Sequence, residues 1–120
     1  MSAPRAATTD LPAVRYATTL DAAGDGECVA YLPDDTTVGV LWWAGGEVVD
    51  VEVHPAWRRR GIATAMLRQA RALDVLAHSN CRTPAGDVWA RSLGAAPAGD
   101  ILDPIVRDSP RGWPAADVTA

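Results

Sequence analysis

The chain has 120 residues, of which 48% are hydrophobic and 22% are charged, as is typical of one globular domain. Its formal net charge of -4 and its pI near 4.9 argue against general nucleic-acid binding. No stretch approaches the ~18 apolar residues of a membrane span, and the first residues lack the apolar core of a signal peptide. The composition therefore predicts a soluble, cytoplasmic protein that binds neither nucleic acid nor membranes.

The two cysteines and two histidines do not form a metal-binding pattern. Cys28 and Cys81 match no CxxC or His/Cys spacing, and neither His54 nor His78 has two companion ligands nearby in the sequence. In a reducing cytosol two free thiols are the default state. We therefore expect no metal site and no disulfide.

The first half of the chain has the pattern of a β-meander. Residues 1–12 lack periodicity and are expected to form a flexible tail. Four β-rich stretches follow, separated by short turn sequences rich in Gly and Asp. Connections this short join antiparallel neighbours. The expected strands are 13–20, 27–33, 37–44 and 47–55.

The second half changes to helical spacing. Apolar residues recur every three or four positions over 61–74, which predicts a helix. The short apolar stretch 75–79 is expected to form a fifth, parallel strand, which makes the connection a right-handed crossover. Thr83 is the expected N-cap of a second helix that ends at Gly94. The core is expected to span 13–96, followed by a proline-rich, irregular segment over 97–120, where Pro104 argues against an edge strand.

The strand-to-helix junction, HPAWRRRGIATAML over 54–67, carries the densest positive charge in the chain. The first N–H groups of a helix have no intrahelical partner, and the helix dipole adds partial positive charge beside them. Gly61 has no Cβ to keep a ligand away from the backbone, and the three arginines before it can reach outward. The junction therefore predicts a phosphate-binding site, against the plainer alternative of a solvated basic face.

The same stretch resembles motif A of the GNAT N-acetyltransferases. That motif is a β-strand followed by (Q/R)-x-x-G-x-(G/A) at the start of a helix, and Arg58, Gly61 and Ala63 occupy its positions in VEVHPAWRRRGIATAML. The order of elements also resembles the family's core over residues 13–94. The resemblance implies an α/β (α+β) GNAT-like fold with a mostly antiparallel mixed sheet, the motif A helix and one further helix.

The resemblance further implies acetyl-CoA as cofactor. In the family the fourth and fifth strands separate and hold the pantetheine arm, while the backbone after the strand holds the pyrophosphate. One strand N–H, of Val51 or Glu52, would polarise the acetyl carbonyl. The implied cofactor-binding residues are Val51, Val53, Arg58, Arg59, Arg60, Gly61, Ile62, Ala63, Thr64 and Thr83.

Three departures from the family pattern bear on catalysis. Ala90 stands where the family usually has a tyrosine that protonates the leaving thiolate, and Thr83 replaces an asparagine that often caps this helix. Almost no sequence lies between the first two strands, where two helices usually shape the acceptor pocket. The chain would therefore be a minimal member with an open acceptor side.

Three residues are candidates for proton transfer. Glu47 has an offset similar to that of the general base in the histone-acetyltransferase branch, and Glu52 would lie beside the acetyl group. His78 would face the cleft and could replace the missing tyrosine. Each also has a plain structural interpretation, as a solvated strand carboxylate for the two glutamates and as a turn-capping group for the histidine.

We therefore expect direct acetyl transfer from acetyl-CoA to a primary amine of a small molecule or a protein. The alternative is a non-catalytic acyl-CoA-binding or interaction module of the same fold, which the missing tyrosine favours. A nucleic-acid contact through the arginines is the least favoured interpretation, because the protein is acidic overall. A homodimer is a further expectation, since small members of the family often pair through their sheets.

Overall fold

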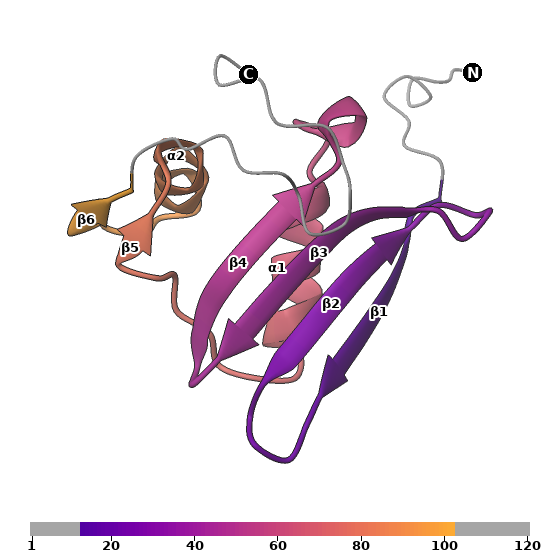
Figure 1. Ribbon diagram of the computed structural model, residues 1–120, viewed down its shortest axis with the longest axis horizontal. Helices are drawn as coiled ribbons and strands as arrows, with labels where there is room; N and C mark the ends of the chain where they lie inside the picture. The colour runs from indigo at the N-terminus through magenta and orange to yellow at the C-terminus, as the bar shows by residue number, and fades with distance from the viewer. Residues whose placement is uncertain (1–12, 103–120) are drawn as a thin grey trace, which may run out of the picture.

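A computed structural model describes residues 13–102 of the chain (Figure 1). Its main element is a four-stranded antiparallel sheet in the order β1-β2-β3-β4. The predicted meander is confirmed, with ends that differ by one or two residues; the tail expected over 1–12 and the segment beyond 102 lie outside the described residues. The strands are β1 (Arg15–Leu20), β2 (Gly26–Tyr31), β3 (Thr37–Ala44) and β4 (Glu47–Val53).

One face of the sheet is covered by the helix α1 (Ile62–Arg71), whose buried residues pack against β2 and β3 (Figure 1). A Cβ at Gly39 would lie 3.0 Å from both Ile62 and Met66, so glycine lets the helix approach the sheet closely. The helix ends at Arg71 and not at Asp74 as predicted, and a tighter turn follows it, in which the Leu73 N–H donates to Ala70 at 2.9 Å.

The fifth strand predicted over 75–79 is wrong. Ala77 alone forms a parallel bridge, with Glu47, in which the Val48 N–H donates to Ala77 and the Ala77 N–H donates to Gly46, both at 2.9 Å. The apolar stretch does not continue as a strand because the neighbouring β4 departs from regular pairing just after this bridge. The chain pairs next at β5 (Cys81–Arg82), in parallel with β6 (Asp100–Ile101).

The helix α2 (Pro84–Ser92) lies beside this small β5-β6 sheet, at the margin of the main sheet (Figure 1). The Thr83 hydroxyl accepts the Gly86 N–H at 3.1 Å, and Gly94 follows the helix with a φ of 95°. Both predicted ends of α2 are therefore confirmed. None of the helices within 13–102 is long and apolar enough to cross a membrane.

Candidate active site

The strand β4 changes its pairing at Val49. Trp42 pairs with Asp50 and Trp43 pairs with Val48, so one extra residue, Val49, interrupts the ladder as a β-bulge. A bulge bends its strand and is frequent beside active sites. Before the bulge, β4 is paired on its outer side with Ala77, and beyond it no described strand pairs with that side. The bulge therefore opens one edge of β4 over its second half.

The direction of the main-chain groups shows which residues this open edge presents. The His54 N–H donates to Val38 of β3, at 2.8 Å, so it points into the sheet. Alternate residues of a strand point to opposite edges. The main-chain groups of Val51 and Val53 therefore point toward the open edge, and the Val53 carbonyl accepts the Arg58 Nε–H there at 2.9 Å.

The open edge leads into a turn over residues 59–64, hereafter the 59–64 turn, which starts α1. Arg59 and Gly61 have φ values of 60° and 83° in this turn, and the helix has no side-chain N-cap and no acidic residue in its first turn. The first helical bond runs from Ala65 to Gly61, so the N–H groups of the preceding residues have no carbonyl one turn back. Left-handed residues beside a helix start form concavities that bind anions.

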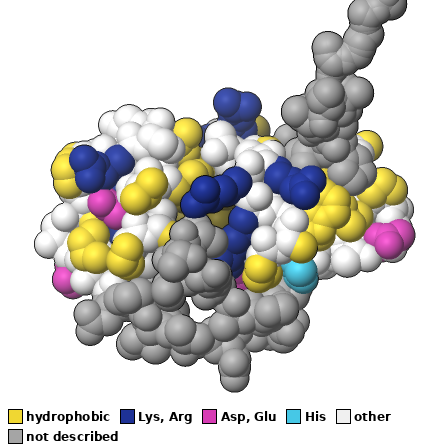
Figure 2. Space-filling view, turned by 90° about the horizontal axis from the view of Figure 1, so that it is seen from above, with side chains coloured by type: hydrophobic (Ala, Val, Ile, Leu, Met, Phe, Trp, Pro, Cys, Tyr) yellow, Lys and Arg dark blue, Asp and Glu magenta, His cyan; other side chains and the backbone are white. Residues whose placement is uncertain are grey.

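Space and charge at the 59–64 turn fit that interpretation. A Cβ placed on Gly61 would meet no atom within 4 Å, so the turn is open to solvent. The Arg60 guanidinium lies 5.0 Å from the centre of the Trp57 ring, while Arg59 is exposed. Arginine side chains gather at this end of the molecule (Figure 2). The charge attracts anions, although Arg58 itself is engaged with the β4 backbone.

The second helix contributes an indole to the start of α1. The Trp89 Nε1–H donates to the Thr64 hydroxyl at 3.2 Å, and the His78 ring meets the Trp89 ring edge-on with centroids 5.1 Å apart. Burial, followed by the charges of Arg71 and Arg82, lowers the pKa of His78, so its imidazole is neutral at pH 7. Its Nε2 is buried and has no hydrogen-bond partner in the described part of the chain.

The candidate catalytic residues lie on different sides of the sheet. Val48 and Val51 pack toward α1, so the side chains of their neighbours, Glu47 and Glu52, project from the opposite face. Glu47 is exposed and Glu52 is half-buried, whereas His78 lies with Trp89 on the α1 side. The fold thus brings the two carboxylates to one face and leaves the imidazole apart from them.

The remaining predicted positions have structural partners of their own. Thr83 is engaged as the N-cap of α2, and Ala90, at the place expected for tyrosine, is buried. Trp89 is half-buried, packs against the core and joins α2 to α1. Helical periodicity contains no signal for that contact, because Thr64 lies 25 residues away.

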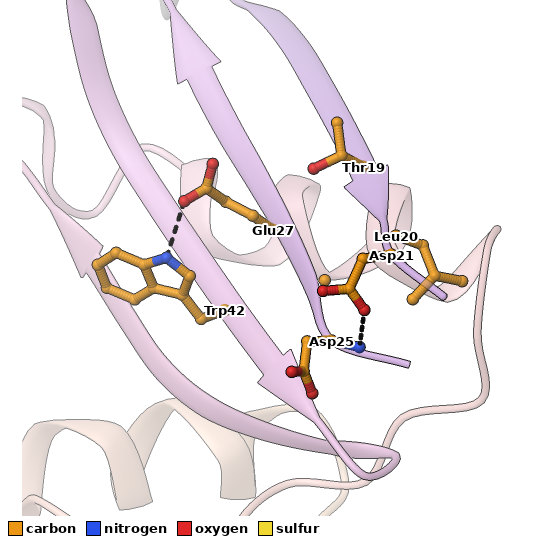
Figure 3. Close-up of a pocket in the computed structure, with 7 residues that line it drawn as sticks. Thr19, Leu20, Asp21, Asp25, Glu27 and Trp42 are labelled. Carbon is orange, nitrogen blue, oxygen red and sulfur yellow. Dashed lines mark hydrogen bonds between the residues drawn. The ribbon is translucent and has the colours of Figure 1, made fainter. Parts of the chain in front are cut away.

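The face opposite α1 also carries an open pocket of about 370 Å³, at the β1-β2 turn (Figure 3). In it the Trp42 Nε1–H donates to Glu27 at 2.8 Å, while the Asp21 carboxylate accepts the Asp25 N–H at 3.0 Å. Of the two adjacent tryptophans, Trp43 is buried in the core, whereas Trp42 lies at this pocket. The pocket is lined by Thr19, Leu20, Asp21, Asp25, Gly26, Glu27 and Trp42.

The described residues form neither a metal-binding group nor a disulfide. Within residues 13–102, no three His, Cys, Asp or Glu side chains come together as a metal-binding group. Cys28 is buried and Cys81 is exposed, and both are free thiols in the structure.

Comparison with known proteins identifies the family. The sequence model of the Acetyltransferase (GNAT) family matches residues 4–93, three quarters of the chain. Among solved structures, the "Putative acetyl transferase from Pyrococcus furiosus" is similar, with 21% sequence identity and a TM-score of 0.33; the match covers 78% of this chain and 61% of that one. No curated protein matches the sequence. The family match, which spans both the β4 edge and the 59–64 turn, establishes that this chain belongs to the GNAT family of acetyltransferases.

Proposed function

We propose that the protein is an acetyl-CoA-dependent N-acetyltransferase that moves an acetyl group directly to a primary amine. One observation carries the proposal: the open edge of β4 leads, through a short 3₁₀ helix at Pro55–Trp57, to an uncapped helix start. An extended amide-containing chain can pair with such an edge, and a phosphate group can bind such a helix start. Acetyl-CoA contains both groups in one molecule.

Acetyl-CoA would lie along β4 in this proposal. The Val51 carbonyl and the Val53 N–H pair with the pantetheine amides, since both point toward the open edge. The N–H groups of the 59–64 turn, including those of Gly61, Ile62, Ala63 and Thr64, bind the pyrophosphate. Arg59 and Arg60 supply attraction at the rim, and Arg58 holds the end of β4. Thr83 contributes by starting α2, the helix that carries Trp89.

The acetyl carbonyl would lie beside the bulge. The Val51 N–H is the oxyanion donor, because strand alternation directs the Glu52 N–H toward its partner Val40 on β3. The amine nitrogen attacks the carbonyl carbon, the carbon–sulfur bond breaks, and CoA leaves as a thiolate. The thiolate takes its proton from solvent, since Ala90 offers no acid and the neutral His78 carries no spare proton at pH 7.

The acceptor amine would approach from the face opposite α1. That face carries Glu47 and Glu52, which attract an ammonium group and can accept the proton that the amine must lose. His78 lies with Trp89 on the other side of the sheet, so it takes no part in deprotonating an amine that approaches from this face. The proposal therefore favours cationic amines as acceptors.

The test begins with binding and then measures turnover. Acetyl-CoA should raise the melting temperature of the protein, and CoA release should depend on an added amine across a panel of cationic acceptors. Glu47→Gln and Glu52→Gln are compared with Asp50→Asn, a third carboxylate of the same strand. At least one glutamate variant should lose turnover while keeping affinity. If millimolar acetyl-CoA leaves melting unchanged, the proposal is wrong.

A second function is favoured by the buried Ala90 at the tyrosine position: a non-catalytic acyl-CoA-binding module. It predicts the same increase in melting temperature but no amine-dependent CoA release. Turnover with any member of the amine panel rejects this alternative, and binding without turnover across the whole panel selects it.

A further inference from the structure

The contact between Trp89 and Thr64 links the two helices at the proposed cofactor site. The Trp89 Nε1–H donates to the Thr64 hydroxyl oxygen at 3.2 Å. We propose that Trp89 is a positioning residue, which orients the Thr64 hydroxyl so that it donates to the bound diphosphate. This inference rests on the proposed acetyl-CoA function and assigns a role to a residue of α2 outside motif A.

The position of Thr64 supports a ligand contact. It is the third residue of α1, so its own N–H belongs to the uncapped first turn. Threonine within a helix commonly turns its hydroxyl back to a carbonyl of the preceding turn. Such a back-bond would use the hydroxyl proton locally. The Trp89 N–H occupies one lone pair of the Thr64 oxygen and so restricts the directions in which the hydroxyl proton can point.

The chemistry of the two groups determines the direction of the bond. An indole N–H can only donate, whereas a hydroxyl has one proton and two lone pairs. Thr64 therefore accepts from Trp89 and keeps its own proton for another acceptor. The nearest acceptor implied by the proposed function is a phosphate oxygen at the 59–64 turn. Hydrogen bonds to charged acceptors are stronger than neutral ones.

The indole is itself held in place. The His78 ring packs edge-on against it at an interplanar angle of 83°, and the adjacent Ala90 anchors α2 in the interior. Trp89 joins α2 to α1, and α2 also packs against β5. A rigid donor of this kind fixes one rotamer of Thr64 before the ligand arrives, which lowers the entropic cost of binding.

The experiment measures acetyl-CoA affinity by calorimetry for a set of matched variants. Trp89→Phe keeps a ring against His78 but removes the N–H, and it should weaken binding about 3- to 10-fold, the effect of one hydrogen bond. Thr64→Val should weaken binding at least as much, and Thr64→Ser should restore it. The double variant of Trp89→Phe and Thr64→Val should bind like Thr64→Val alone, because both changes remove the same interaction.

Trp42→Phe is the matched control. It removes another indole N–H bond to an oxygen, at 2.8 Å to Glu27, but on the face opposite α1, and it should leave the affinity unchanged. If the wild type binds acetyl-CoA and Trp89→Phe binds equally well, the positioning role is wrong and the proposed function stands. Additive losses in the double variant also overturn the role. If the wild type does not bind acetyl-CoA, both proposals are wrong.

Discussion

The two helices of this protein begin in opposite ways. α2 has a side-chain N-cap from Thr83, a proline at its first position and Asp87 in its first turn. α1 begins at Gly61 in a left-handed conformation, with no side-chain cap and no acidic residue. A side-chain N-cap contributes about 1 kcal/mol to the free energy of unfolding. The start of α2 has this contribution, whereas the start of α1 lacks it. The open start is therefore the one available to a ligand.

Charge strengthens this contrast. The Asp87 carboxylate accepts the Ala98 N–H and an N–H of Arg82, each at 2.9 Å. The Ala98 N–H and the Arg82 guanidinium together lower the pKa of Asp87, so this carboxylate remains ionised at the start of α2. The start of α1 follows three arginines, and no acidic residue lies in its first turn. An external anion can supply the missing charge only at α1.

Removing the internal anion of α2 should have the largest effect on stability. Arg82 and Asp87 are both nearly buried, so Asp87→Ala leaves a guanidinium without its partner. The melting temperature should fall by roughly 10 °C or more. Acetyl-CoA affinity, measured by calorimetry well below melting, should stay near the wild-type value. A large loss of affinity in the folded variant would show that the two helix starts are not independent.

Placing an anion at α1 should have the largest effect on binding. Aspartate tolerates the left-handed region better than most residues, so Gly61→Asp should fold while its carboxylate repels the diphosphate. Acetyl-CoA affinity should fall about 100-fold, as measured by calorimetry. Gly94→Asp is the control, since Gly94 also has a positive φ and open space around it but follows α2. Equal losses in both variants would contradict a binding role for the 59–64 turn.

Removing the cap of α2 should have a moderate effect. Thr83→Ala deletes the hydroxyl that accepts the Gly86 N–H, and chemical unfolding should show a loss of about 1 kcal/mol. Acetyl-CoA affinity should fall less than in Trp89→Phe, because Thr83 acts on the cofactor site only through the start of α2. Thr83→Ser, which keeps the hydroxyl, should retain most of the stability. A Thr83→Ala variant with full stability would show that capping does not distinguish the two helices.

The smallest effect concerns His78, which adjoins the contact between the helices. Its folded-state pKa is lowered, so below pH ~6.5 the unfolded chain binds more protons than the folded one. Stability should therefore be complete above that pH and decrease as the pH falls below it. His78→Gln should reduce this decrease by a few degrees of melting temperature between pH 7 and 5. A His78→Gln variant with the same pH profile as the wild type would reject the assignment.

Much of the fold was predictable because its signals are local. The alternating strands, the glycine turn at 45–46 and the Thr83-Pro84 helix start each depend on neighbours within a few residues, and all of them are confirmed. The failure of the fifth strand to form was not predictable. The apolar composition of 75–79 is typical of a strand, but whether this segment pairs depends on β4. The bulge at Val49 ends that pairing after Ala77, and no local pattern marks it.

For the candidate site as well, the local features could be predicted from the sequence, whereas the contacts between distant residues could not. The sequence by itself determined the helix start with its glycine and arginines, because backbone conformation and charge there follow from consecutive residues. Only the tertiary structure decided that β4 has an open edge, that the glutamates and His78 lie on opposite sides, and that Trp89 contacts Thr64. Each of these features involves residues that lie far apart in the chain. Tertiary packing brings them together, and the periodicity of the sequence does not specify that packing.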